Sequence, residues 1–314
     1  MNIVFMGTPE FAVPSLRVLL EGGYNIVGVV TQPDRPKGRK RVLTPPPVKV
    51  EALAHGLPVL QPARMRSPEA VEELARLKPD LIVTAAYGQI LPKAVLDLPK
   101  LGCINVHGSL LPKYRGGAPI QHSIMNGEPE TGVTIMYMAE GLDTGDMISR
   151  TALPIGEEDT AGTMFEKLAV AGAALLKETL PAIIEGRIEA VPQNDEEATY
   201  SPNITRDDER IQWQRSARDV FNQVRGLNPW PVAFTLWNGE VFKVWKCRIG
   251  TVMRSPGAET LVPGTVLRVS DEGIEVAAGD GTVLLTEVQP AGKKAMDVAQ
   301  FNRGSKLEAG TVFG

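Results

Sequence analysis

An amide and an imidazole stand two positions apart in the run Asn105-Val106-His107. If this run ends a β-strand, both side chains point to one face, because side chains alternate along a strand. An amide can hydrogen-bond a developing oxyanion, and an imidazole can assist proton movement or, when charged, stabilise the same oxygen. The pair therefore suits an acyl-transfer site, although an Asn-x-His at a strand end can also do no more than fix a turn.

A stiff, basic loop follows and extends the motif through Ser109-Leu-Leu-Pro-Lys-Tyr-Arg-Gly-Gly-Ala-Pro-Ile-Gln121. It combines two prolines and a glycine pair with two cationic side chains, Lys113 and Arg115. An aspartate, Asp143, stands further along in a Gly-Leu-Asp-Thr-Gly-Asp run. The Asn-x-His pair, the Ser-Leu-Leu-Pro-x-Tyr-Arg-Gly-x-Ala-Pro loop and the later aspartate together resemble the signature of the folate-dependent formyltransferases.

This resemblance implies a reaction and a set of residues for it. A formyl group would pass from 10-formyltetrahydrofolate to an amine through a tetrahedral oxyanion, which Asn105 and His107 would stabilise. Asp143 would orient His107 and favour its charged form. Asp146 is a second carboxylate in the same run, but the family position matches Asp143.

The folate is expected to contact two segments: the loop after His107, and residues 87–91, which resemble the family's segment that lines the folate pocket. Without the resemblance, residues 87–91 could be an ordinary loop after the predicted strand at 80–85. The expected folate-binding residues are Tyr87, Gly88, Gln89, Ile90, Leu91, Ser109, Leu110, Leu111 and Pro112.

A basic insertion follows the second predicted strand. From Arg35 to Lys49 six residues are basic and none is acidic, and several prolines limit helix formation. Such a segment can be a solvated surface loop, or it can order against phosphates and reach into an acceptor stem. It resembles the tRNA-reading insertion of the family members that act on methionyl-tRNA. The implied tRNA-binding residues are Arg35, Lys37, Arg39, Lys40 and Arg41, of which the last three are best placed.

The run from Asn228 to Ala233 is similar to the segment that opens the C-terminal domain in the same branch of the family. The resemblance therefore implies formylation of the α-amine of methionine on initiator methionyl-tRNA, for translation initiation. Two other functions stay open. One is formylation of a nucleotide-linked amino sugar, against which the basic insertion and the C-terminal domain argue. The other is RNA binding without catalysis, against which the intact set of Asn105, His107 and Asp143 argues.

The first half of the chain alternates predicted strands and helices. Apolar strand-like runs lie at residues 3–6, 25–31, 80–85 and 102–106. Their rhythm predicts an α/β fold, a Rossmann-like, mostly parallel open sheet with helices on both faces. Ligands bind beyond the carboxyl ends of the strands in such sheets, where residues 105–109 are expected. Residues 132–138 and 147–153 predict an antiparallel pair, because their connection is too short for a helical crossover.

The second half changes character. Residues 160–186 predict one long helix with Thr160 as its N-cap. Five short strand-like runs follow at residues 232–237, 241–247, 264–269, 273–277 and 282–288. Turn pairs such as Asn238-Gly239 separate several of them, which favours a small OB-like β-barrel. We therefore expect a catalytic domain at 1–188, a polar linker at 189–203 and a tRNA-binding barrel domain at 204–314.

Composition narrows the class of protein. A chain of 314 residues is long enough for two domains, and a net charge of −4 means that a polyanion would meet a local basic patch. No apolar run reaches the roughly 18 residues of a membrane helix. Two cysteines in different halves argue against a disulfide framework, so we expect a cytoplasmic protein. We also expect a monomer. Three histidines without ligand spacing predict no metal, and the lone Gly7 after the first run predicts no nicotinamide cofactor.

Overall fold

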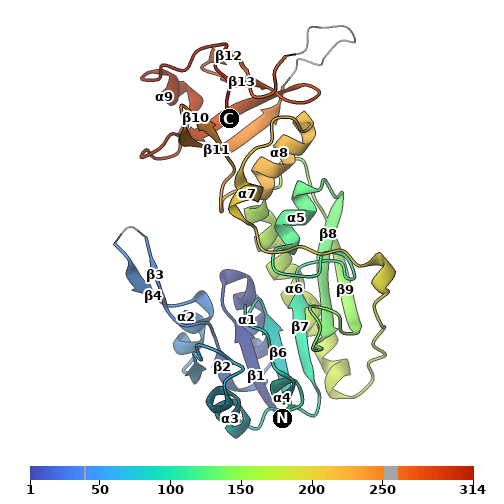
Figure 1. The fold of residues 1–314 in the computed structure, drawn as a ribbon. Coiled ribbons are helices and arrows are strands. Elements are labelled where there is room, and N and C mark those ends of the chain that lie inside the picture. Colours follow the sequence, from blue (N-terminus) through green and yellow to red (C-terminus); the bar gives the residue numbers. More distant parts are fainter. Residues whose placement is uncertain (39, 251–260) are drawn as a thin grey trace. The chain divides into compact units, whose positions relative to one another are not determined.

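The computed structural model describes residues 1–38, 40–250 and 261–314, and the chain divides into two compact units (Figure 1). Unit 1 comprises Met1–Pro119, Glu130–Pro154 and Phe165–Pro202, and unit 2 comprises Ile120–Pro129, Ile155–Met164 and Asn203–Gly314. Two short segments before residue 165 thus belong to unit 2. The sequence-based division into domains at 1–188 and 204–314 with a linker at 189–203 stays a prediction.

Unit 1 contains a seven-stranded sheet with the order β5-β2-β1-β6-β7-β8-β9. Its strands are β1 (Asn2–Gly7), β2 (Asn25–Val30), β5 (Val59–Leu60), β6 (Leu81–Ala85), β7 (Cys103–His107), β8 (Glu130–Tyr137) and β9 (Met147–Pro154). The first five pair parallel with one another, whereas β8 pairs antiparallel with both β7 and β9. The predicted fold class is confirmed, and so is the antiparallel pair.

Helices cover both faces of this sheet. On one face, Leu74 of α3 (Pro68–Arg76) and Val95 of α4 (Lys93–Leu96) share a buried cluster with Ile82 of β6. On the other face, α6 (Ala161–Ile184) lies so close to β7 that a Cβ at Gly172 would stand 2.9 Å from Val106 Cγ1. The remaining helices of the first 160 residues are η1 (Glu10–Ala12), α1 (Val13–Glu21), α2 (Pro47–Ala54) and α5 (Pro119–Met125).

The basic insertion is not a plain loop. It forms a two-stranded antiparallel hairpin of β3 (Arg35–Lys37) and β4 (Val42–Thr44), visible as a projecting ribbon in Figure 1. The turn relies on Gly38 and Arg41, whose φ angles of 71° and 48° lie in the left-handed region. The Arg41 N–H donates to the Gly38 carbonyl at 3.1 Å. The prolines that disfavour a helix are compatible with this two-stranded hairpin. Pro36 has no N–H to donate to a neighbouring strand, and at the edge of a sheet none is required.

Unit 2 contains a second, antiparallel sheet with the order β10-β11-β14-β13-β12, and β15 pairs with β14. Its strands are β10 (Phe234–Trp237), β11 (Glu240–Ile249), β12 (Val266–Ser270), β13 (Gly273–Ala277), β14 (Thr282–Gln289) and β15 (Met296–Asp297). The helices α7 (Arg206–Glu209), α8 (Ala217–Gly226) and α9 (Val298–Asn302) accompany it. All five strands expected here are present. Within the described parts of the chain, no helix is both long and apolar enough to cross a membrane.

Candidate active site

The site is built where two parallel strands end at the same edge of the sheet. Thr84 of β6 is in register with Asn105 of β7. The Thr84 hydroxyl donates to Asn105 Oδ1 at 2.8 Å, which fixes the amide with its oxygen turned toward the sheet. The amide N–H₂ is then the end of Asn105 that can serve as a donor to a bound group.

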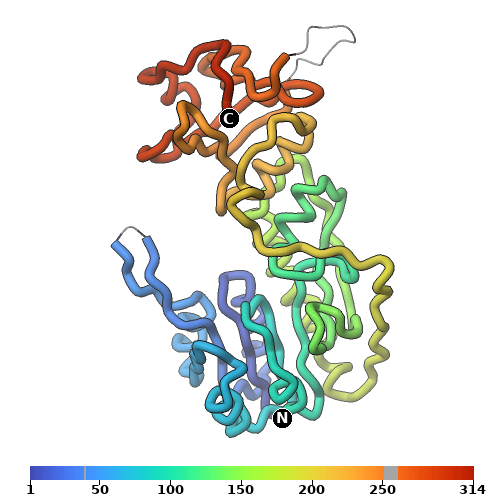
Figure 2. Tube along the Cα trace, viewed as in Figure 1, coloured from blue at the N-terminus to red at the C-terminus, as the bar shows by residue number. Residues whose placement is uncertain are grey.

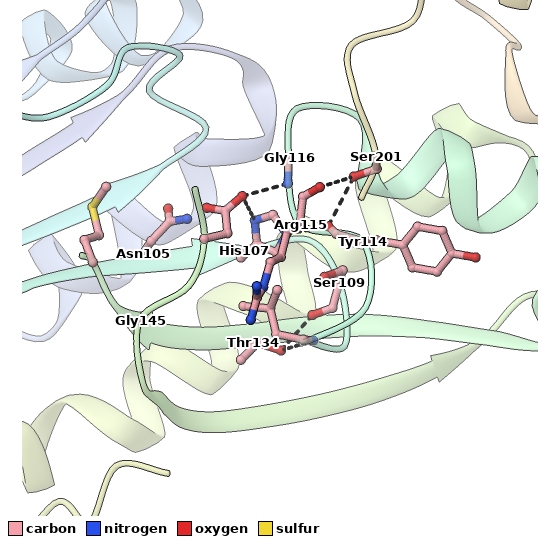
Figure 3. A network of polar contacts seen from close by, with 12 residues as sticks. Asn105, His107, Ser109, Tyr114, Arg115, Gly116, Thr134, Gly145 and Ser201 are labelled. Atoms are coloured by element: carbon pink, nitrogen blue, oxygen red, sulfur yellow. Dashed lines mark hydrogen bonds and ion pairs between the residues drawn. The ribbon is translucent and has the colours of Figure 1, made fainter. Parts of the chain in front are cut away.

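His107 ends the same strand and carries a buried imidazole, 6% exposed. Its Nε2 lies 3.0 Å from the backbone carbonyl of Tyr114. A carbonyl oxygen only accepts, so Nε2 carries a proton and Nδ1 is the nitrogen left for chemistry. Nδ1 lies 3.7 Å from Asp143 Oδ2, and Figure 3 shows this contact beside the labelled Asn105.

Asp143 lies in the connection between β8 and β9, with φ at 51°. The Gly116 N–H donates to the same Oδ2 at 2.8 Å. Gly116 itself has φ at 121°, and a Cβ there would stand 2.6 Å from the Ser201 carbonyl oxygen. Asp146, the other candidate carboxylate, is exposed. The structure therefore brings Asp143, Asn105 and His107 together around one point and leaves Asp146 outside.

The loop after His107 is held from the neighbouring strand. Thr134 of β8 donates from its hydroxyl to the Ser109 carbonyl at 2.7 Å and accepts from the Leu111 N–H at 3.1 Å. The Ser109 hydroxyl donates to the Lys113 carbonyl at 2.7 Å. Ser109, Leu111 and Pro112 are buried, and Leu110 is half-buried. This part of the predicted folate site would meet a ligand through backbone more than through side chains.

The segment after β6 divides into buried and exposed residues. Tyr87 and Leu91 belong to the buried cluster under α3 and α4, and burial raises the pKa of the Tyr87 phenol to about 12. Gln89 uses its amide to accept from Met65 N–H at 2.7 Å and to donate to the Pro62 carbonyl at 3.1 Å. Gly88 is exposed, and the Ile90 side chain is 82% exposed. Of the five residues predicted to bind folate in this segment, Ile90 is the apolar one whose side chain is exposed.

Residues 193–201, which were predicted to be part of a linker, hold the backbone of the loop at Arg115. This contact was not predicted from the sequence. This 193–201 segment belongs to unit 1 and contains the short 3-10 helix η2 (Asp195–Glu197); Figure 2 shows its course along the chain. The Arg115 N–H donates to the Thr199 carbonyl at 2.9 Å, and the Ser201 N–H donates to the Arg115 carbonyl at 2.7 Å. The only sequence signal was a cluster of polar side chains between two prolines, which is also how a linker looks.

Arg115 is the largest fully buried side chain of the described residues, 2% exposed. Its guanidinium pairs with Asp195 at 2.8 Å, contacts the Tyr200 hydroxyl at 3.4 Å and donates from Nε to Gln193 Oε1 at 3.0 Å. Burial lowers the pKa of this guanidinium, but the hydrogen bonds to Asp195 and Tyr200 outweigh it and leave the pKa above its ordinary value. Arg115 is therefore a charged anchor inside the protein, not a surface cation for a polyanion.

The cations of the hairpin are placed differently. Arg35, Lys37, Lys40 and Arg41 are exposed, whereas Arg39 lies outside the described residues. The base of the hairpin is fixed by Asp34, which accepts from Lys49 at 2.9 Å and from Gln61 at 2.7 Å. The hydrogen bonds from Gln61 and Lys49 hold the pKa of the Asp34 carboxyl below its ordinary value. The hairpin thus presents exposed cations on an anchored base.

Among residues 1–38, 40–250 and 261–314, no group of three or more histidine, cysteine or acidic side chains could hold a metal ion. The groups gathered at the β7 edge are instead an amide, an imidazole and a carboxylate. They suit a reaction in which charge develops on an oxygen and a proton moves.

Comparisons with known proteins agree with this chemistry. The family model for Formyl transferase matches residues 1–180, and the model for Formyl transferase, C-terminal domain, matches residues 203–306. The methionyl-tRNA formyltransferase of Bacillus subtilis (strain 168) is 59% identical over 314 residues, covering 100% of this chain and 98% of the relative. The methionyl-tRNA formyltransferase of Geobacillus thermodenitrificans (strain NG80-2) is 56% identical over 316 residues, with the same coverage.

Solved structures with this fold are more distant in sequence. An N-formyltransferase from Helicobacter canadensis, in complex with folinic acid and dTDP-3-aminofucose, has a TM-score of 0.69 at 21% identity and covers 92% of this chain and 98% of its own. HypX from Aquifex aeolicus, in complex with tetrahydrofolic acid, has a TM-score of 0.65 at 19% identity and covers 99% of this chain and 50% of its own. At these identities the likeness concerns the fold alone.

Proposed function

Because this chain belongs to the formyl transferase family, we propose that it transfers the formyl group of 10-formyltetrahydrofolate to the α-amine of methionine on initiator methionyl-tRNA. The observation that carries the reaction class is the convergence of Asn105, His107 and Asp143 at one strand edge. The choice of acceptor rests on full-length relatives that are 59% and 56% identical and carry that activity in their names.

The chemistry uses the three side chains in distinct roles. The neutral α-amine, whose ordinary pKa is about 7.7–8.0, attacks the formyl carbon and forms the new C–N bond. The amide N–H₂ of Asn105 and the protonated Nδ1 of His107 donate to the resulting oxyanion. The bond to N10 then breaks, N10 takes up the proton that the amine has lost, and the formyl carbonyl re-forms. Asp143 keeps the His107 ring oriented and offsets its positive charge.

The folate lies against the exposed side of residues 87–91, with Ile90 as an apolar contact and the backbone of residues 109–112 on its other side. The exposed cations of the hairpin contact phosphates of the acceptor stem, which explains why an acidic protein can hold a polyanion. We assign the activity to a cytoplasmic monomer, and two buried free cysteines fit a reducing compartment.

A comparison of two acceptors, each incubated separately with the protein, tests the proposal. The protein is incubated with 10-formyltetrahydrofolate and either methionyl-tRNA or a dTDP-linked amino sugar, and the formylated product is measured. We expect product from methionyl-tRNA alone. Product from the amino sugar alone would move the protein to that branch of the family, and binding of tRNA without any product would make it an RNA-binding protein.

A further inference from the structure

Gln193 lies in the 193–201 segment and uses both ends of its side-chain amide. Its Nε2 donates to the carbonyl of Asp143 at 2.7 Å and to the carbonyl of Gly145 at 2.8 Å. Its Oε1 accepts from Arg115 Nε at 3.0 Å. Carbonyls only accept and a guanidinium only donates, so these partners permit a single orientation of the amide.

The two carbonyls bound by Gln193 lie in the turn that carries the Asp143 carboxylate, at Asp143 itself and at the second residue after it. This turn is unusual in two respects, because Asp143 has φ at 51° and because a Cβ at Gly145 would stand 1.8 Å from the Tyr137 carbonyl oxygen. A non-glycine residue with positive φ persists only where surrounding contacts stabilise that backbone conformation. The two hydrogen bonds from Gln193 stabilise it from outside the turn.

The same segment also fixes the partner of His107. The Ser201 hydroxyl shares its donated hydrogen bond between the Tyr114 carbonyl at 3.2 Å and the Arg115 carbonyl at 3.1 Å, and the Tyr114 oxygen is the one that faces His107 Nε2. Thr199 Oγ1 accepts from the Tyr114 N–H at 2.9 Å. Both members of the His107–Asp143 pair are therefore held through contacts with the 193–201 segment.

We propose that Gln193 is a positioning residue for formyl transfer: it holds the Asp143 turn so that the carboxylate stays opposite His107 Nδ1. This inference rests on the proposed function. Gln193 itself need not touch either substrate, since it acts through the backbone of Asp143. Its replacement is expected to lower kcat for formyl transfer and to leave substrate binding almost unchanged.

Two substitutions test this role. Gln193→Glu keeps the shape and an acceptor for Arg115 but removes both donated hydrogen bonds, and Gln193→Met removes all three. Displacing a catalytic group by about 1 Å can cost on the order of 10²-fold in rate, so we expect kcat to fall at least ~10-fold in both variants. The KM values for 10-formyltetrahydrofolate and methionyl-tRNA should stay within about twofold, because the substitutions weaken stabilisation of the transition state and leave uniform binding in place.

Glu196→Gln is the matched control, because this exposed side chain lies on the same segment and contacts neither carbonyl. It should keep the parental kcat. Folded Gln193→Glu protein with parental kcat would overturn the inference, and so would a fall in kcat matched by an equal rise in both KM values.

A crystal structure of Gln193→Glu separates this inference from the proposed function. We expect the Asp143 carboxylate to have moved away from His107 Nδ1. If it keeps its place, the inference is wrong even where activity has fallen. If the parental protein formylates neither methionyl-tRNA nor an amino sugar, the proposed function fails, and the position of Asp143 in the variant still decides the role of Gln193.

Discussion

Asp143 Oδ2 lies 3.7 Å from His107 Nδ1, although His107 ends β7 and Asp143 lies in the connection between β8 and β9. The Asp143 side chain is 15% exposed and that of His107 is 6% exposed, so little water competes for the contact. Because the Tyr114 carbonyl accepts the hydrogen bond from the Nε2–H group, Nδ1 is the ring nitrogen that faces the carboxylate. The Asp143 carboxylate is therefore placed to orient the imidazole ring of His107.

Replacing that carboxylate should impair chemistry more than folding. Asp143→Asn keeps an oxygen for the Gly116 N–H but removes the negative charge beside Nδ1. We expect kcat to fall by about 10²-fold, the scale typical of removing one electrostatic interaction from an active site. Steady-state kinetics and a thermal unfolding curve measure the two effects. Asp146→Asn, at the exposed aspartate in the same connection, should retain the parental kcat. An equal decrease in kcat in both variants would show that the Asp143 carboxylate has no specific part in the reaction.

The hairpin cations should act on tRNA binding and not on the chemical step. Replacing Lys37, Lys40 and Arg41 together by alanine should weaken tRNA affinity. The slope of log Kd against log salt should shrink by about 1 for each phosphate that the protein no longer neutralises. Filter binding at several salt concentrations measures both quantities.

The matched control for the hairpin replaces three exposed cations elsewhere on unit 1, Lys78, Arg150 and Lys177. It should leave affinity and slope near the parental values. Full tRNA affinity in the hairpin variant at physiological salt would show that this ribbon is only a solvated surface feature.

Gly116 should tolerate no side chain. In Gly116→Ala the new Cβ would stand 2.6 Å from the Ser201 carbonyl oxygen at a φ of 121°. We expect a decrease in stability of about 1–3 kcal/mol from backbone strain, together with a fall in kcat as the donor to Asp143 shifts. Gly186→Ala has a positive φ of 67° but no neighbouring atom within 4 Å, so it separates the backbone cost from the clash. Equal unfolding free energies for the two variants would show that the close approach to Ser201 does not matter.

Both cysteines should be unreactive while the protein is folded. Burial raises the pKa of the Cys103 thiol to about 12 and raises that of Cys247 above its ordinary value. The thiolate is the reactive form, so a disulfide reagent such as DTNB at pH 8 should label neither residue until denaturant is added. Unfolded protein, in which both thiols should react, is the control. Rapid labelling of either thiol in the absence of denaturant would mean that a cysteine is accessible.

The sequence predicted the architecture well where hydrophobic periodicity determines it. The predicted strand at residues 80–85 is the central strand β6, which spans Leu81–Ala85 and is buried along its whole length. The short connection at Asp143 required the antiparallel pair β8 and β9. The hairpin in the basic insertion was not predicted. Its strands are three residues each and largely exposed, so no alternation of burial marked them.

The motif predicted Asn105, His107 and Asp143 as catalytic residues. The structure places Asp143 opposite His107, and Asn105 lies two positions before His107 on β7, so the catalytic role of the three stays a prediction with a geometry that permits it. The buried packing of Tyr87 and Leu91 was not predicted. Gln193 could not have been found, because its role depends on a backbone carbonyl far away in sequence. A polar residue between prolines has the same local pattern whether its side chain is solvated or bound.

The central claim is that Asn105 and His107 act together on the formyl oxygen, and single-turnover formyl transfer tests it most directly. Labelled 10-formyltetrahydrofolate is mixed with methionyl-tRNA and excess enzyme, and the rate of label transfer is followed for the parental protein, Asn105→Ala and His107→Ala. We predict that each variant slows the chemical step by about 10²–10³-fold, with tRNA Kd nearly unchanged. Transfer at the parental rate by either correctly folded variant would contradict the account.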